Sequence, residues 1–310
     1  MMLDFKEFQQ FVENHLVEYL PTEYKNASLV IHKVQKNNGL VLTGLTVLPI
    51  GHNIAPTIYL DSYFENYQNG RALYDILGDI CTVACVHMNP NNFGSIETDF
   101  QNFDYVKDRV IMVAVNRQKN EEFLRQVPHH NFEDLALIYK VLITEASPDI
   151  ATITIYNQHM SFWNTSESEL YDLAMKNTKE LLPVKVQRIM PGEMYMISNM
   201  PHINGAAAIL YDDVLSEISE RVESDLFIIP SSVHECLAVS VEYTDAKELA
   251  EMVETVNEEK LEENEILSNN VYRFNAKDKT IALANTSVEE LGLLNNNECA
   301  KAAMHPRRCR

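Results

Sequence analysis

The chain has 310 residues, of which 45 are acidic and 25 basic, so its formal net charge is −20. A field of that sign repels phosphate backbones and anionic lipid, which argues against direct nucleic-acid binding and against docking on a membrane. Asp4 and Glu7 near the start and the lack of a long apolar run argue against a signal peptide or a membrane span. Five irregularly spaced cysteines do not make a disulfide framework. We expect a soluble cytoplasmic protein with reduced thiols.

Hydrophobic periodicity divides the chain into alternating helices and short strands. In the first half it predicts a helix over 3–20, strands over 28–34, 40–48 and 56–60, one or two helices over 62–88, a loop over 89–94, a strand over 110–115, a helical turn over 121–126 and strands over 135–144 and 150–156. In the second half it predicts helices over 166–181, from Asp212 or Asp213 to Val222, and over 244–256, with strands over 194–198, 206–210, 225–229, 236–241, 271–274 and 280–283.

Turn and cap residues support several of these boundaries. Asn38-Gly39 tolerates positive φ and is typical of a hairpin turn. Ser166 with Glu169 three residues later has the spacing of a capping box at a helix start. Pro230–Glu235 separates two β-rich runs and predicts a second hairpin.

Hairpins outnumber strand–helix–strand units, so the predicted fold class is α+β with mainly antiparallel sheets and flanking helices. The predicted organisation is an N-terminal α+β region over 1–120, a C-terminal α+β region over 121–285 and a polar tail over 286–310. A single domain over 1–285 is the alternative.

The stretch from Pro230 to Glu235 is the main candidate for chemistry. If Ser232 and His234 lie on one strand, their side chains point to the same side and are close enough to form a nucleophile–base pair. Ser231 and Glu235 complete the candidate set, but neither an orienting acid nor an oxyanion hole can be placed. The structural alternative is a tight hairpin whose serines bond backbone groups.

Two other groups of residues resemble metal ligands. Cys81 and Cys85 share a helix face, but His87 lies round from them and a fourth zinc ligand is missing. His129 and His130 follow Pro128 and are predicted to lie in a loop, without a metalloprotease-type spacing. The chain also has no GxGxxG fingerprint and no phosphate loop, so neither a cofactor nor a metal is predicted.

Several motifs resemble those of a known bacterial family. They are Lys36–Gly39, Pro56–Leu60 with Tyr67 and Gly70, Asp134–Ala136, Glu169–Ala174, Gly205–Ala208, Asp225–Glu235 and Val271–Phe274. The chain resembles domain-of-unknown-function family 5688 from about Phe5 to about Leu283, and the Ile-Pro-Ser-Ser-x-His-Glu block is the most specific part of the likeness. The resemblance implies one coherent bacterial, cytoplasmic protein and brings no activity with it.

Three functional hypotheses follow from these observations. The first is a non-enzymatic protein that works through contacts with a protein partner. The second is a hydrolase-like enzyme that uses Ser231 or Ser232 with His234 and Glu235. The third is an acidic mimic of DNA that inhibits a DNA-binding enzyme, which requires carboxylates such as those within Glu251–Glu265 to form a stripe at phosphate spacing.

Overall fold

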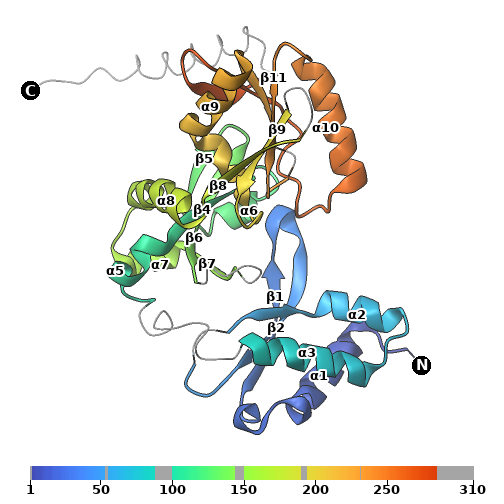
Figure 1. Ribbon diagram of the computed structural model, residues 1–310. Helices are drawn as coiled ribbons and strands as arrows, with labels where there is room; N and C mark the ends of the chain where they lie inside the picture. The colour runs from blue at the N-terminus through green and yellow to red at the C-terminus, as the bar shows by residue number, and fades with distance from the viewer. Residues whose placement is uncertain are drawn as a thin grey trace, which may run out of the picture. The chain divides into compact units, whose positions relative to one another are not determined.

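The computed structural model describes residues 2–52, 55–87, 100–143, 150–189, 194–230 and 232–284. The chain divides into two compact units (Figure 1). Unit 1 comprises Met1–Asn131 and Ala136–Leu182, and unit 2 comprises Phe132–Leu135 and Pro183–Arg310. The short segment Phe132–Leu135 thus belongs with residues that come later in the sequence. The division of the sequence at 120/121 into two regions stays a prediction.

Three antiparallel sheets and the helices beside them confirm the predicted α+β class. The first sheet has the order β1-β2-β3 and the second the order β4-β6-β5, with β7 paired to β6. Their strands are β1 (Ser28–Gln35), β2 (Val41–Leu48), β3 (Thr57–Tyr59), β4 (Val110–Asn116), β5 (His129–Phe132), β6 (Leu135–Leu142) and β7 (Thr152–Thr154). The helices of this part are α1 (Phe5–Tyr19), α2 (Leu60–Gln68), α3 (Leu73–His87), α5 (Phe103–Val106), α6 (Glu121–Leu124), α7 (Asn157–Trp163) and α8 (Glu167–Leu181), with 3-10 turns η1 (Thr22–Tyr24), η2 (Asn37–Gly39) and η4 (Lys107–Arg109).

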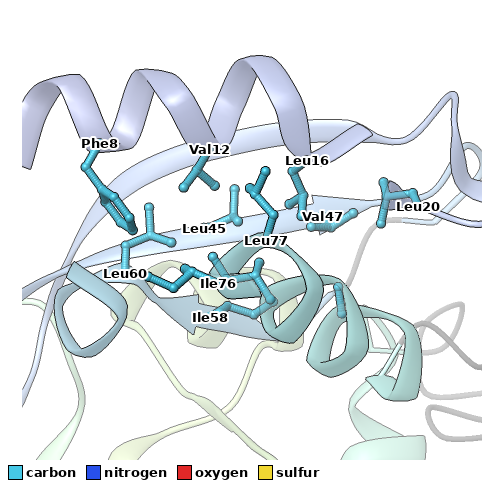
Figure 2. Packing of buried hydrophobic residues seen from close by; sticks show 12 residues of the cluster. Phe8, Val12, Leu16, Leu20, Leu45, Val47, Ile58, Leu60, Ile76 and Leu77 are labelled. Carbon is cyan, nitrogen blue, oxygen red and sulfur yellow. The ribbon is translucent and has the colours of Figure 1, made fainter. Parts of the chain in front are cut away.

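The N-terminal helices pack on the β1-β2-β3 sheet. Figure 2 shows Val12 and Leu16 of α1 directed toward Leu45 of β2, with Leu77 of α3 against the same cluster. These four side chains are at most 1% exposed, because apolar residues at helical spacing meet the inward face of an alternating strand. At the start of this layer Asp4 and Glu7 form a capping box for α1, which had not been predicted, and the β1–β2 hairpin turns at Asn38-Gly39 as predicted.

The tip of the β1–β2 hairpin is held by one buried side chain. Asn38 has a φ of 57° and Gly39 a φ of 77°, as the Asn-Gly turn predicts. The Asn120 side chain accepts the Asn38 N–H at 2.9 Å and donates to the Asn37 and Asn38 side-chain oxygens at 2.9 and 3.0 Å. The amide thereby fixes the hairpin tip to the segment that follows β4.

Helix α8 covers the edge strand β4. Thr178 accepts the Met112 N–H at 3.0 Å, and the Asn177 amide donates to the carbonyls of Lys107 and Val110 at 2.8 and 3.1 Å. Both polar side chains are buried on the helix face that otherwise carries Leu170 and Ala174. They satisfy backbone groups that a strand edge would expose.

Unit 2 is built on a single sheet with the order β13-β12-β10-β11-β9-β8. Its strands are β8 (Val184–Arg188), β9 (Met194–Asn199), β10 (Leu226–Ile229), β11 (Cys236–Ser240), β12 (Tyr272–Asn275) and β13 (Thr280–Leu283). Helices α9 (Asp212–Val222) and α10 (Ala246–Lys260) lie on opposite sides of it (Figure 1). Leu249 and Val253 of α10 pack against Phe227, Ile229 and Val239.

The structure corrects one predicted strand. Residues 206–210 lie in a 3-10 helix, η5 (Gly205–Leu210). Asn204 enters it in the left-handed conformation, and the N–H groups of Gly205 and Ala206 bond the carbonyls of His234 and Val233. Residues 205–209 are all buried, and a short buried apolar run looks the same in a strand and in a helical turn.

Smaller corrections concern boundaries. His129 and His130 are in strand β5, not in a loop, because the strand pairs with β6. Neither Asp212 nor Asp213 caps α9, since Tyr211 is its N-cap. Ser166 accepts the Glu169 N–H, but the Glu169 carboxylate accepts the Thr165 hydroxyl at 2.6 Å instead of closing a capping box. Strand β8 and helices α5 and α7 had not been predicted, whereas the predicted loop over 89–94 lies outside the described residues.

Candidate functional site

The turn between β10 and β11 contains the predicted candidates and joins three segments of unit 2. Ser232, Val233 and His234 lie in the turn itself and not on a strand, whereas Ser231 is outside the described residues. The Val233 N–H donates to the Glu265 carbonyl at 2.9 Å, which ties the turn to the segment after α10. The His234 carbonyl accepts the Gly205 N–H at 3.1 Å and the Ser198 hydroxyl at 2.7 Å.

Gly205 is the point of closest approach in this site. A Cβ atom there would lie 2.5 Å from the Ser198 Oγ, 2.6 Å from the Asn199 nitrogen and 2.7 Å from the His234 oxygen. Two of these three atoms are backbone, which does not move out of the way as a flexible side chain does. The glycine in the Gly-Ala-Ala-Ala run is therefore required by contact between segments.

The side chains of Ser232 and His234 bond backbone groups and not each other. The Ser232 Oγ accepts the His234 N–H at 3.0 Å, and the His234 Nδ1 accepts the Asn204 N–H at 3.2 Å. Because Nδ1 is an acceptor, the neutral imidazole carries its hydrogen on Nε2. That nitrogen is 3.7 Å from the Glu265 Oε1, and both side chains are about one-third exposed, at 35% and 36%. Neither imidazole nitrogen is bonded to Ser232.

Glu235 occupies the last position of the turn, directly before β11. Burial, and then the negative charge of Glu235, raise the pKa of the Cys236 thiol well above its usual value. Cys236 lies 3.6 Å from the Ala206 carbonyl and is fully buried, so it is an inert thiol within the core. Glu235 thus directly precedes β11, and its charge acts on the thiol at the start of that strand.

A hydrogen-bonded loop after β9 forms the other side of the site. Its residues His202 and Asn204 both have positive φ, at 56° and 53°. The Asn199 amide bonds both backbone groups of Ile203, at 2.8 and 3.1 Å. Lys185 of β8 lies 3.0 Å from the His202 Nε2, and since an ammonium only donates, that nitrogen is the acceptor.

Sequence analysis missed a second polar cluster in unit 2, centred on Asp134. Its carboxylate accepts the Ser268 hydroxyl at 2.5 Å, the Asn270 amide at 3.0 Å and the Tyr272 hydroxyl. Burial, and then Asp134, raise the pKa of Tyr272. The Asn257 amide of α10 donates to the Ser268 carbonyl at 3.1 Å. The local signal in the sequence was a run of three polar residues at 268–270 shortly before β12, which by itself resembles a loop.

The predicted metal-ligand groups have separate environments. His129 Nδ1 lies 3.0 Å from the Val127 carbonyl, whereas the His130 ring packs at a tilt of 35° against the Tyr171 ring, with centroids 4.4 Å apart. The Cys81 and Cys85 sulfurs are 3.8 Å apart on α3. Among the residues that the structure describes, no three His, Cys, Asp or Glu side chains are placed to hold a metal ion together.

The outer face of α10 carries a group of exposed charged side chains. It presents the five exposed glutamates of the helix, Glu248, Glu251, Glu254, Glu258 and Glu259, which we call the acidic face. Lys247 and Lys260 are the two cations of this helix, 3.9 Å from Glu251 and 4.0 Å from Glu259. Met252 and Val256 lie beside the acidic face and are 45% and 43% exposed.

Comparison with known proteins gives a family but no function. No curated protein and no solved structure matches the chain. Within the described residues, no helix has both the length and the apolar character needed to cross a bilayer. A match to DUF5688, described as a family of unknown function, covers residues 5–192 and 187–276. Since these two segments span most of the sequence, the chain belongs to domain-of-unknown-function family 5688.

Proposed function

We propose that this chain is a non-enzymatic cytoplasmic protein that binds a basic surface of another protein through the acidic face of α10. The observation that carries the proposal is the composition of that helix. Five exposed glutamates accompany only two lysines, and two exposed apolar side chains lie next to them. Apolar contacts surrounded by charges that match the partner are typical of protein interfaces. The free thiols of Cys81, Cys85 and Cys236 fit a reducing compartment.

The contacts that hold α10 on the sheet support a role in presenting its acidic face to a partner. Leu249 and Val253 anchor the helix to the sheet, and Asn257 anchors its last turn to Ser268. A helix held along its length keeps its outward side chains in one arrangement, so less conformational freedom is lost on binding. The negative field also attracts a basic partner from a distance and raises the association rate constant.

The experiment first identifies the protein that contacts α10 and then measures how its association with the chain depends on charge. A photo-crosslinking amino acid replaces Thr255, which is exposed between the glutamates, and in a second protein it replaces Asn14, which is exposed on α1. We expect one basic protein to be crosslinked from position 255 and not from position 14. The partner is then purified, and its association with the full chain is measured at several salt concentrations.

Two variants of equal net charge separate the acidic face from total charge. The test variant carries Glu251→Gln, Glu254→Gln and Glu258→Gln, and glutamine keeps the helix propensity. The control variant carries Glu13→Gln, Glu23→Gln and Glu122→Gln, all at exposed positions of unit 1. We expect the test variant to lower the association rate constant about tenfold at low salt, with less than a twofold change in the control. Equal effects of the two variants would exclude the acidic face as the contact.

Mimicry of DNA is a narrower version of the same proposal. Along a helix that rises about 1.5 Å per residue, Glu251, Glu254 and Glu258 are separated by about 4.5 and 6 Å along the axis, compared with about 3.4 Å of axis per phosphate on each DNA strand. The stripe ends with the helix at Lys260. If the crosslinked partner is a DNA-binding protein, duplex DNA should compete with the chain for it. A partner that binds DNA and the chain together would exclude mimicry and leave the broader proposal intact.

The hydrolase hypothesis for Ser231, Ser232, His234 and Glu235 is less well supported. It requires the His234 imidazole to leave the Asn204 N–H and the Ser232 hydroxyl to leave the His234 N–H. A Ser231→Ala, Ser232→Ala double variant tests it against a panel of ester substrates. Ester turnover by the purified chain that this variant abolishes, with folding intact, would restore the hypothesis.

A further inference from the structure

Helix α3 carries two thiols one turn apart in unit 1. The sulfurs of Cys81 and Cys85 are 3.8 Å apart, and Cys81 also donates to the Tyr19 carbonyl at 3.1 Å. Both cysteines are partly exposed at the edge of the N-terminal core, so a small ion reaches them from solvent. Their i and i+4 positions place both side chains on one helix face. No part of the proposed binding function uses them.

We propose that Cys81 and Cys85 form a bidentate thiolate site for a soft monovalent cation of the Cu(I) type. Soft thiolate ligands select Cu(I) over harder ions, and Cu(I) needs only two or three ligands. With metal–sulfur bonds of about 2.3 Å, sulfurs 3.8 Å apart subtend an angle of about 110° at the metal. The same sulfurs reach the roughly 4.6 Å separation of a linear site by rotation about their Cα–Cβ bonds.

The surroundings disfavour zinc at this position. A structural zinc site is closed by four ligands. Across the described ranges of the chain, no set of three His, Cys, Asp or Glu side chains converges, so those ranges supply only two of the four ligands that zinc requires here. Two thiolates can complete the coordination of a cation that needs only two ligands, and Cu(I) is such a cation.

The helix geometry also disfavours a disulfide between the two residues. The Cβ atoms of residues i and i+4 on a helix are about 5–6 Å apart, whereas a disulfide brings them to about 3.5–4.5 Å. Forming the bond would distort α3, but a bridging metal ion spans the two sulfurs without bending the backbone. The geometry therefore favours metal coordination over oxidation.

Binding is an exchange of protons for the metal without a change of oxidation state. Two S–H bonds break, two metal–sulfur bonds form, and two protons are released to solvent for each Cu(I) bound. Burial, and then the neighbouring Cys85, raise the pKa of Cys81 to about 11, so the Cys81 thiol carries its proton until the cation displaces it. The product is a bis-thiolate complex with one net negative charge.

The test is an anaerobic competition titration of Cu(I) against bathocuproine disulfonate. All proteins are full length and carry Cys299→Ser and Cys309→Ser, which removes the two thiols outside the described residues. Cys81→Ser and Cys85→Ser are each added to this background, and Cys236→Ala, at the buried thiol of unit 2, is the matched control. Circular dichroism checks that each variant retains its helices.

We expect the background protein and the Cys236→Ala control to bind one Cu(I) with the same affinity. Each single serine variant should lose at least about 100-fold in affinity, because the second thiolate acts at high effective concentration. X-ray absorption of the background protein should show two sulfur ligands on each copper, a measurement that needs no variant. Copper without sulfur ligation, or serine variants within threefold of the background, would overturn the proposal.

Discussion

Replacing Asp134 by alanine tests the polar cluster that organises one end of unit 2. The carboxylate accepts hydrogen bonds from Ser268, Asn270 and Tyr272. Ser268 is 1% exposed and Tyr272 is fully buried, so truncation leaves two buried hydroxyls without their acceptor. No other polar group in the cluster accepts from all three donors.

The size of the effect follows from the number of bonds and from solvent access. A hydrogen bond to a charged group contributes about 1.5–3 kcal/mol, so three such bonds set an upper range of about 4.5–9 kcal/mol. Asp134 itself is only partly buried, so water can take the place of its carboxylate and recover part of this hydrogen-bond free energy. We expect Asp134→Ala to lower the free energy of unfolding by about 3 kcal/mol. With a urea dependence of about 2–3 kcal/mol per molar, the midpoint falls by about 1 M.

Urea unfolding is followed by far-UV circular dichroism, with Asp278→Ala as the control. Asp278 is exposed in the β12–β13 turn of the same unit. The single tryptophan, Trp163, belongs to unit 1, so its fluorescence shows whether the loss extends beyond unit 2. Asp134→Asn keeps the shape and one acceptor and should cost about 1 kcal/mol. A stability of Asp134→Ala within 1 kcal/mol of the control would refute the reasoning.

Three further measurements test other parts of the structure. Gly205→Ala should destabilise the protein by about 2–3 kcal/mol because its Cβ meets backbone atoms. Gly78→Ala should stabilise it by about 1 kcal/mol, because the new Cβ in α3 meets nothing within 4 Å. Urea unfolding of both variants gives the sign of each change in the free energy of unfolding. Leu45→Ala, in the core of Figure 2, should cost about 2–5 kcal/mol, and Val41→Ala, 50% exposed on the same strand, less than about 0.5 kcal/mol. Burial, and then the charge of Lys36, lower the pKa of Lys140 from 10.5 to about 8. The unfolded chain therefore binds more protons between these two values, so stability should rise with pH across that window, and Lys140→Met should abolish the rise in unfolding measured at pH 7 and 9.5.

Local patterns predicted the fold where the deciding interactions are close in sequence. The helix periodicity of α1 and α3, the Asn38-Gly39 turn and the alternation in β2 each lie within one element or one connection. Their α+β combination followed from the excess of hairpins. The exact start of α9 was wrong because Tyr211 caps a helix without a side-chain bond, which leaves no signature in the sequence.

The predictions failed where distant segments decide the local conformation. Residues 206–210 form η5 because the turn after β10 accepts the N–H groups at its start, and that turn is about 30 residues away. Asp134 is brought to Ser268 across 134 positions of sequence. Hydrophobic periodicity reports on contacts within one helix or strand, so it gives no sign of contacts over such sequence separations. Only the folded structure shows that these residues meet.

The candidate turn and the Asp134 cluster both bond the segment that follows α10. The chain leaves α10 after Lys260, bonds the Val233 N–H through the Glu265 carbonyl, and then places Ser268 on Asp134. Asn257, in the last turn of α10, donates to the Ser268 carbonyl, so the helix end is bonded to the same segment. The turn that contains Ser232 and His234 is thus bonded, through the Val233 N–H, to the segment that follows α10. The Ser232 and His234 side chains bond backbone groups of His234 and Asn204, so they hold the turn whose Val233 N–H contacts the segment after α10. This arrangement is consistent with the proposal that α10 presents a binding face.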